Sequence, residues 1–220
     1  MDIDLIQYYL VDIILPGLGT TLIILLFTVL FTTVAGFIIG SILFITAEGG
    51  LYPHPKFNMI LGLIINIIRA IPVIIFIVLM IPITRGILGT AIGTPAAILS
   101  ISIMCTPFMT RVIEGRLKEV DKSLIEAARS MGLSNMQTLT KYVIHAAVPS
   151  LVSGITFATV IFLGIIAIAG TIGAGGIGAI AMDYGYLAFN SYVMYGSIMI
   201  LAVLVIIIQV TGRFLYNKLK

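Results

Sequence analysis

The stretch RVIEGRLKEVDKSLIEAARSMGLSNMQTLTKYVIHAAVP, from Arg111 to Pro149, is the long polar run of a chain that is otherwise apolar. Of the 220 residues, 60% are hydrophobic and 10% are charged, whereas a soluble domain averages about 25% charged residues. There is too little polar side chain to cover a globule in water. The composition therefore predicts an all-α integral membrane protein in which residues 111–149 form a loop between apolar helices.

The centre of this loop has the pattern of a short amphipathic helix. Ser123 and Glu126 have the spacing of a capping box, in which a serine caps the helix and a carboxylate three residues later reaches back to it. Gly132 suits the left-handed conformation that ends a helix. The apolar residues that fall on one face of this helix are Leu124, Ala127, Ala128 and Met131.

A second short helix is predicted after the glycine hinge. Ser134 and Gln137 repeat the capping signal. A second apolar stripe follows, made of Met136, Leu139 and Val143. We expect the membrane helices to cover part of the two stripes and a soluble partner to cover the rest.

Five apolar runs are long enough to cross a bilayer, which takes about 20 residues. These spans are residues 18–47, 57–84, 87–108, 151–172 and 192–214. Residues 1–17 read as a short amphipathic lead-in and residues 215–220 as a tail. Only a few residues around Arg85 and Gly86 separate the second and third spans, which predicts a tight hairpin.

Small residues indicate where helices pack closely. Gly36 with Gly40 in the first span, and Gly89 with Gly93 in the third, have the GxxxG spacing that brings two backbones together. Such pairs also arise by chance in a chain with 22 glycines, so a packing role and a chance spacing both stay open for each pair.

The basic residues predict the orientation in the membrane. With the N-terminus outside, the inner segments hold ten Lys and Arg residues and the outer segments hold only Arg85. Because short cytoplasmic loops carry the excess of Lys and Arg, we expect the N-terminus outside and the C-terminus inside. This topology places the 111–149 loop in the cytoplasm.

Arg69 is the one charged residue well inside a predicted span. A lipid-exposed arginine there costs at least about 2.5–3.5 kcal/mol, so it should face protein, a polar cavity or the membrane surface. Asn66 lies one turn earlier on the same face, and Pro72 is expected to break the helix and free backbone carbonyls. Either these three residues line a pathway or subunit interface, or Arg69 is a structural cation neutralised by carbonyl oxygens.

The sequence Gly173-Ala174-Gly175-Gly176-Ile177-Gly178 matches GxGxxG letter for letter. A dinucleotide site needs a strand before this motif and an acidic residue about 20 positions later, and here an apolar span precedes it. We therefore predict a flexible or close-packed turn at the outer mouth of the bundle, formed by Gly173, Gly175, Gly176 and Gly178. An ordinary glycine-rich turn explains the pattern equally well.

No catalytic or cofactor-binding pattern is found along the chain. His54 and His145 lie far apart in the sequence, no metal-ligand spacing occurs, and there is no Walker A sequence for ATP hydrolysis. The basic residues lie beside apolar spans, so the net charge of +3 does not indicate nucleic-acid binding. We expect no enzyme activity, metal or cofactor in this chain. The rival functions from other classes are an intramembrane enzyme, which would need paired polar groups inside the spans, and a passive channel, which would not need the patterned loop.

Glu126, Ala127 and Ala128, followed after three residues by Gly132, resemble the EAA motif of ABC importer permeases. In that family the loop docks on the ATPase subunit as the coupling helix, so the resemblance implies that these four residues contact an ATPase. The family motif continues with Ile, any residue, Leu and Pro. Tyr142, Ile144 and His145 fall at those positions here, and we expect Pro149 to take over the helix-ending role of the missing proline.

Further stretches resemble the permease subunit of methionine ABC importers over about residues 20–213. These stretches are Asn66-Ile67-Ile68-Arg69-Ala70-Ile71-Pro72, Met80-Ile81-Pro82-Ile83-Thr84-Arg85, Gly89-Thr90-Ala91-Ile92-Gly93, and the 173–178 turn followed by Tyr184-Gly185-Tyr186.

The resemblance implies a homodimer of this chain in the cytoplasmic (inner) membrane. It also implies two ATP-binding subunits that carry ATP and Mg, and an extracytoplasmic methionine-binding protein. The expected cargo is L-methionine, with D-methionine as a further expected substrate; the alternative within the class is another amino acid or a quaternary amine such as glycine betaine, because betaine permeases share the glycine turn.

Overall fold

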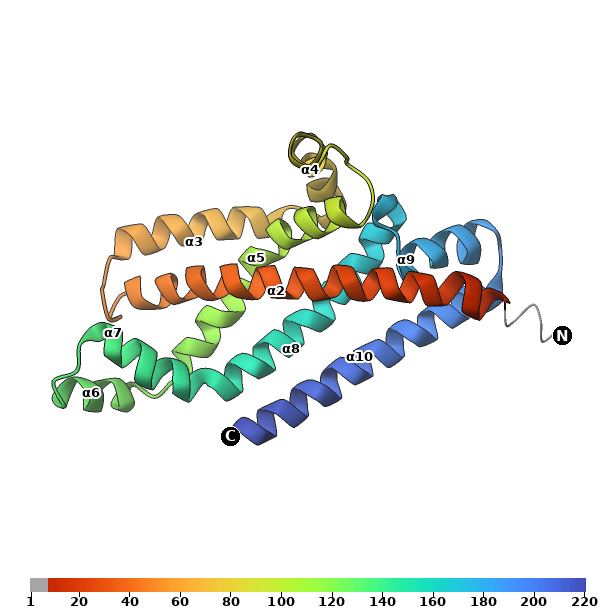
Figure 1. The fold of residues 1–220 in the computed structure, drawn as a ribbon. Helices are drawn as coiled ribbons and strands as arrows, with labels where there is room; N and C mark the ends of the chain where they lie inside the picture. Colours follow the sequence, from red (N-terminus) through yellow and green to blue (C-terminus); the bar gives the residue numbers. More distant parts are fainter. Residues whose placement is uncertain (1–7) are drawn as a thin grey trace. The chain divides into compact units, whose positions relative to one another are not determined.

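The computed structural model describes residues 8–220, and these residues form helices joined by turns, with no strand among them (Figure 1). The elements, with η for a π-helix, are η1 (Tyr9–Ile14), α2 (Leu15–Thr46), α3 (Pro55–Ala70), α4 (Val73–Leu88), α5 (Thr94–Lys118), α6 (Lys122–Ser130), α7 (Asn135–Gln137), η2 (Thr138–Val143), α8 (Ile144–Ala169), η3 (Gly170–Ala174), α9 (Ile177–Ile180), η4 (Ala181–Leu187) and α10 (Ser191–Leu219).

Four helical stretches in the described residues are long and apolar enough to cross a membrane. They are Val11–Thr46, Thr94–Lys118, Asn135–Ala174 and Ser191–Leu219. α3 and α4 are long and apolar enough to cross a membrane only when they are taken together. Counted as one broken span, they bring the number of spans to five. The all-α membrane fold expected from composition is therefore confirmed.

The break between α3 and α4 lies where the sequence predicted it. Pro72 has φ −58° and ψ 142° and stands at the N-cap of α4, and α3 ends at Ala70. Proline cannot donate a backbone hydrogen bond and restricts the residue before it. The predicted hairpin at Arg85 and Gly86 is wrong, because α4 continues through both residues to Leu88 and turns at Gly89, whose φ is +74°.

Several element ends differ from those expected from hydropathy. Residues 8–17 of the predicted lead-in are helical and continue into α2, whereas residues 1–7 lie outside the described part. α5 continues ten residues past the predicted span end, to Lys118. It can do so because oppositely charged side chains three and four residues apart stabilise a helix even where the sequence has become polar.

The chain divides into two compact units, which are described separately. One unit consists of the described part of Met1–Phe31, with Ile71–Cys105 and Thr159–Gln209. Its fully buried side chains include Ile14, Ile24, Ile101, Phe162, Ile166, Ile177 and Val193. The hydroxyl oxygen of Thr21 on α2 accepts a hydrogen bond from the amide of Ile177 at 2.9 Å, which fixes α9 to α2.

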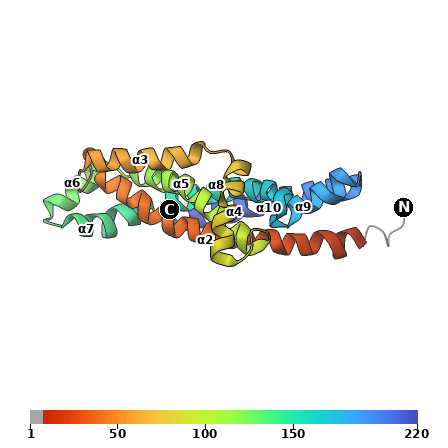
Figure 2. The same ribbon diagram turned by 90° about the horizontal axis from the view of Figure 1, so that it is seen from above.

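The other unit consists of Thr32–Ala70, Thr106–Ala158 and Val210–Lys220. Its buried side chains include Leu43, Met109, Ile113, Leu117, Val143 and Ala158. In this unit, α3 runs beside the end of α2, and α6 and α7 lie at the turn that joins them, as Figures 1 and 2 both show. Asn58 ties the first turn of α3 to α2, because its amide nitrogen donates to the carbonyl oxygen of Leu43 at 2.7 Å.

Close packing in this second unit depends on Gly36 and Gly40. A Cβ atom on Gly36 would lie 2.8 Å from Cγ of Met109, and one on Gly40 would lie 2.8 Å from the carbonyl oxygen of Thr110. The packing role of this GxxxG pair is therefore confirmed. The pair Gly89 and Gly93 has no such role, since both glycines have positive φ in the turn between α4 and α5 and have open space around them.

Candidate functional site

Within residues 111–149, α6 follows the end of α5, and its N-terminus is capped by Asp121. A side-chain oxygen of Asp121 accepts a hydrogen bond from the amide of Ser123 at 2.8 Å. Hydrogen bonds from the backbone and side chain of Ser123 lower the pKa of the exposed Asp121 carboxyl. The capping box predicted for Ser123 and Glu126 is wrong, because the helix begins one residue before Ser123, at Lys122.

The glycine hinge and the second cap have the predicted geometry. Gly132 has φ +77°, the left-handed conformation. Ser134 and Gln137 form a reciprocal capping box, with Gln137 Oε1 accepting from the Ser134 amide at 3.0 Å and Ser134 Oγ accepting from the Gln137 amide at 3.3 Å. The loop is thus a helix, a glycine turn and a second capped helix, as the sequence indicated.

The second helix is not short, and Pro149 does not end it. The helix that begins at Asn135 continues through η2 and α8 to Ala169, and Pro149 lies inside α8. A proline removes one backbone hydrogen bond, and apolar helices tolerate this where nearby groups satisfy the freed carbonyl. The helix-ending role expected of Pro149 is therefore wrong.

The two apolar stripes are divided between the protein and the surface. Ala128, Leu139 and Val143 are buried, whereas Met131 is 70% exposed and Met136 is 58% exposed. Glu126 and Ala127 are also exposed. The loop therefore presents two flexible thioethers beside a carboxylate, a surface that suits contact with another protein.

A pocket of about 380 Å³ lies between α6 and the turn after α2. Apolar side chains line part of it, among them Phe44, Leu51 and Ile125. The charged residues in its wall are Glu48, Lys118, Lys122, Glu126 and Arg129. Glu126 of the predicted docking motif thus lies at the edge of a hollow with charges of both signs.

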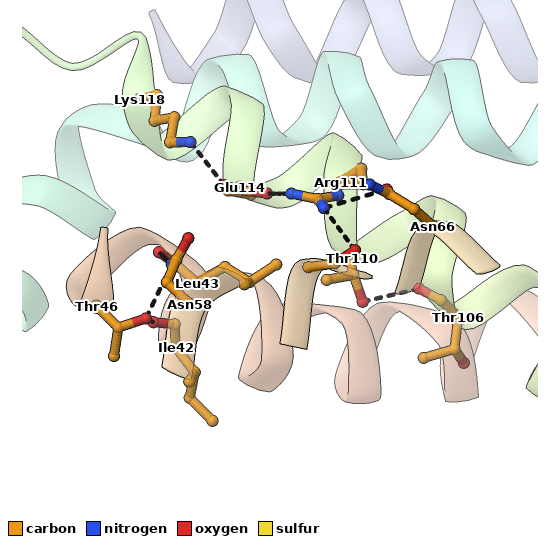
Figure 3. A network of polar contacts seen from close by, with 11 residues as sticks. Ile42, Leu43, Thr46, Asn58, Asn66, Thr106, Thr110, Arg111, Glu114 and Lys118 are labelled. Atoms are coloured by element: carbon orange, nitrogen blue, oxygen red, sulfur yellow. Dashed lines mark hydrogen bonds and ion pairs between the residues drawn. The ribbon is translucent and has the colours of Figure 1, made fainter. Parts of the chain in front are cut away.

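A buried carboxylate that sequence reasoning missed lies in α5, one turn before the last residue of that helix. Glu114 is 4% exposed, and its oxygens lie 2.8 Å from Nη1 of Arg111 and 2.6 Å from Nζ of Lys118 (Figure 3). The other terminal nitrogen of Arg111 donates to the Gly62 carbonyl oxygen at 3.0 Å and to Oδ1 of Asn66 at 3.1 Å. In the sequence, the spacing of Arg111, Glu114 and Lys118 at i, i+3 and i+7 indicates ion pairs along a helix, but it does not indicate that Glu114 is buried.

Arg69 and Asn66 are not partners of one another in the contacts observed. The guanidinium of Arg69 lies 5.7 Å from the centre of the Phe108 ring, a cation–π arrangement. Asn66 is instead bound to Arg111. Arg69 lies in the last turn of α3, where the negative end of the helix dipole favours a cation, so the position suits both the structural and the pathway interpretation.

The glycine turn of residues 173–178 lies in the other unit and is tightly packed. Gly173, Gly175 and Gly176 have φ of +98°, +80° and +82°. The Gly173 carbonyl oxygen accepts from the amide of Gly93 at 2.9 Å. A Cβ atom on Gly178 would collide with the backbone carbonyl of Ala167. Of the two predicted properties, flexible or close-packed, the geometry favours close packing.

Nothing in residues 8–220 groups three His, Cys, Asp or Glu side chains in a way that could hold a metal ion. The described geometry offers a loop with exposed apolar and acidic side chains, joined directly to long helices.

Comparisons with known proteins match nearly the whole chain. The family described as "Binding-protein-dependent transport system inner membrane component" matches residues 36–220. A probable D-methionine transport system permease protein MetI of Pasteurella multocida is 38% identical over 206 residues, which cover 93% of this chain and 95% of the relative. The methionine import system permease protein MetP of Bacillus subtilis is 38% identical over 176 residues, covering 80% of this chain and 79% of that protein.

The fold matches a solved structure over the full length of both chains. A chain of the MetNI methionine ABC transporter, solved in inward-facing conformations, superposes with a TM-score of 0.93 and 35% sequence identity, and the match covers 100% of each chain.

Proposed function

Because the chain belongs to the family of binding-protein-dependent transport system inner membrane components, we propose that it is the membrane-spanning subunit of an ATP-driven methionine importer. Members of this family are transport subunits and not enzymes. The observation that carries the proposal is the 38% identity to a D-methionine permease over 95% of that relative. The imported solute is L-methionine, with D-methionine as a further substrate.

The loop of residues 121–137 is the contact with the ATPase. Glu126, Ala127, Ala128 and Gly132 make the docking element: Glu126 and Ala127 are exposed, the buried Ala128 fits α6 to its own unit, and Gly132 turns the chain. The exposed Met131 and Met136 add apolar contact area to the same surface. ATP and Mg belong to the partner subunits.

The orientation places this loop in the cytoplasm, the N-terminus outside and the C-terminus inside. The excess of Lys and Arg on one side of the spans supports this topology. Two copies of the chain enclose the pathway, two ATP-binding subunits bind below them, and an extracytoplasmic binding protein delivers methionine. The transmembrane domain takes up residues 18–214.

Transport follows from two states of this assembly. ATP binding brings the two docking loops together and opens the outer mouth, and hydrolysis restores the inward-facing state. A ligand or nucleotide shifts such an equilibrium only by its differential affinity for the two states. The glycine turn of residues 173–178 borders the outer mouth, and Asn66, Arg69 and Pro72 border the pathway or the subunit interface.

The partnership is tested by purifying a tagged copy of the chain from its native membrane in mild detergent. The proposal predicts an ATPase subunit at one per copy of this chain, identified by mass spectrometry. Recovery of the chain without an ATPase, also under conditions that trap ATP, would favour the passive channel instead.

The identity of the solute is tested separately. Uptake of labelled methionine should be reduced by excess unlabelled methionine and unaffected by glycine betaine or by amino acids with charged side chains. Stronger competition by another solute would assign the importer to that solute, while leaving the transport class in place.

A further inference from the structure

We propose that the carboxylate of Glu114 is a positioning group that makes α3 move together with the docking loop. The proposal rests on the transport function proposed above and assigns a role to residues outside the docking motif. Three contacts of the last turns of α5 carry it, and all of them lie within one compact unit.

The first contact is the charge cluster itself. Glu114 is 4% exposed, and its two oxygens are held separately, Oε2 by Arg111 and Oε1 by Lys118. Removing a carboxylate from water is costly unless ion pairs and hydrogen bonds replace the lost hydration. Both oxygens have such a partner, so the side chain has one well-defined position.

The second contact reaches α3. With Nη1 bound to Glu114, the planar guanidinium of Arg111 has Nη2 directed at the Gly62 carbonyl oxygen and the Asn66 amide oxygen, which stand one turn apart on α3. The fork geometry of arginine allows this double attachment, which the single ammonium of lysine would not reproduce. Glu114 thereby fixes the register of α5 against α3.

The third contact is with α2. A Cβ atom on Gly40 would lie 3.2 Å from the backbone nitrogen of Glu114 and 2.8 Å from the carbonyl oxygen of Thr110. α2 and α5 therefore approach each other at the level of the charge cluster. Three helices meet at Glu114, and none of them can slide past the others without breaking a polar contact or a close packing contact.

The cluster is also joined to the docking loop through a short segment. Lys118 is the last residue of α5, and Asp121, three residues later, caps α6. A displacement of α6 by the ATPase is thus applied to Lys118, passes through Glu114 and Arg111, and reaches α3. An apolar cluster of the same volume could be equally stable, but it would not define the axial register in the same way.

The chain contains a matched control at the C-terminal end of α5. Arg116 and Glu119 form an ion pair of 2.7 Å with the same i, i+3 spacing, but their side chains are 32% and 52% exposed. Their hydrogen bond, from Arg116 Nη1 to Glu119 Oε1, stays within one short stretch of chain and does not involve α3. Glu119→Gln removes this ion pair at the end of α5 without affecting the attachment to α3.

The experiment compares Glu114→Gln with Glu119→Gln in the complete complex, reconstituted in liposomes with its ATPase and binding protein. ATP hydrolysis and methionine uptake are measured in the same vesicles. We expect Glu119→Gln to match the unaltered protein within about twofold, as exposed pairs contribute little. The Glu114→Gln complex should still contain the ATPase subunit and hydrolyse ATP. Its methionine uptake should fall by about tenfold or more, so that more ATP is consumed for each methionine imported.

A second variant keeps the test informative if the Glu114→Gln protein does not fold. Arg111→Lys keeps a cation for Glu114 but loses the fork to Gly62 and Asn66, so it should raise the ATP consumed per methionine while its melting temperature stays close to that of the unaltered protein. An unchanged ratio of ATP to methionine in Arg111→Lys, or in an assembled Glu114→Gln complex, would overturn the positioning role. Absence of ATP-driven uptake in the unaltered complex would instead overturn the proposed function.

Discussion

The side-chain amide nitrogen of Asn135 donates a hydrogen bond of 2.7 Å to the backbone carbonyl oxygen of Leu51. This contact joins the start of α7, in the docking loop, to the turn between α2 and α3, residues that are 84 positions apart in the sequence. This hydrogen bond therefore attaches the loop to the transmembrane helices in addition to its covalent connections.

Replacing Asn135 by Ala should loosen this attachment. The Leu51 carbonyl loses its partner, which costs roughly 1 kcal/mol for a typical hydrogen bond. Hydrogen exchange at residues 133–139 should become faster, with Met136→Ala as the control because Met136 is exposed and its removal leaves the contact in place. Equal exchange in all three proteins would contradict the second attachment.

Replacing Gly132 by Val should release the ATPase. A β-branched residue is strained at φ +77°, by about 1–2 kcal/mol or more, and relief of that strain reorients α6 relative to α7. Gly89→Val is the control, because Gly89 has φ +74° and open space around it but lies outside the loop. Co-purification of the ATPase should fall for Gly132→Val only; retention with both variants would show that the glycine turn does not shape the docking surface.

Replacing Gly40 by Ala should separate α2 from α5. The added Cβ would lie 2.8 Å from the Thr110 carbonyl oxygen, and such overpacking costs about 1–3 kcal/mol. Thermal unfolding in detergent should show a lower midpoint than for Gly115→Ala, since a Cβ on Gly115 meets nothing within 4 Å. An identical midpoint for the two variants would mean that the helices adjust without cost.

Replacing Thr21 by Val should destabilise the unit that holds the glycine turn. The buried amide of Ile177 would lose its acceptor, at a cost of about 1–3 kcal/mol. Thr21→Ser retains the hydroxyl and should stay near the unaltered midpoint of thermal unfolding. If Ser and Val lower the midpoint equally, the methyl packing of Thr21 matters more than its hydrogen bond.

The cap of α6 should depend on pH. Hydrogen bonds from Ser123 lower the pKa of Asp121 in the folded loop, so the stabilisation is complete above the ordinary carboxyl pKa and is lost as pH falls through the lowered folded value. Exchange at the Ser123 amide, corrected for its intrinsic rate, should lose protection in acid. Asp121→Asn, which accepts the bond without titrating, should not show that loss, and a shared pH dependence would refute the assignment.

Features set by local chemistry were predictable from the sequence. The helix is interrupted at Pro72, Gly132 is suited to a left-handed turn, and the reciprocal cap of Ser134 and Gln137 needs only four consecutive residues. The start of α6 was misplaced because Asp121 and Ser123 are both good caps, and the choice between them depends on where the preceding helix ends.

Features set by distant contacts were not predictable in the same way. Glu114 reads as a charge at the beginning of a polar loop, but it is buried where Gly40 of α2 approaches its backbone and where Arg111 links it to Gly62 of α3. Helical spacing placed Asn66 on the same face as Arg69, whereas its side chain is hydrogen bonded to Arg111 of another helix. Periodicity along one helix cannot show which residues a neighbouring helix brings to it.

ATP-driven uptake of labelled methionine into liposomes that contain this chain, its co-purified ATPase and the binding protein tests the central claim most directly. We predict accumulation that requires ATP and the binding protein and that Gly132→Val abolishes while Gly89→Val preserves. Accumulation that proceeds without ATP, or no accumulation of methionine with a fully assembled and ATP-hydrolysing complex, would contradict the assignment of this chain as a methionine permease.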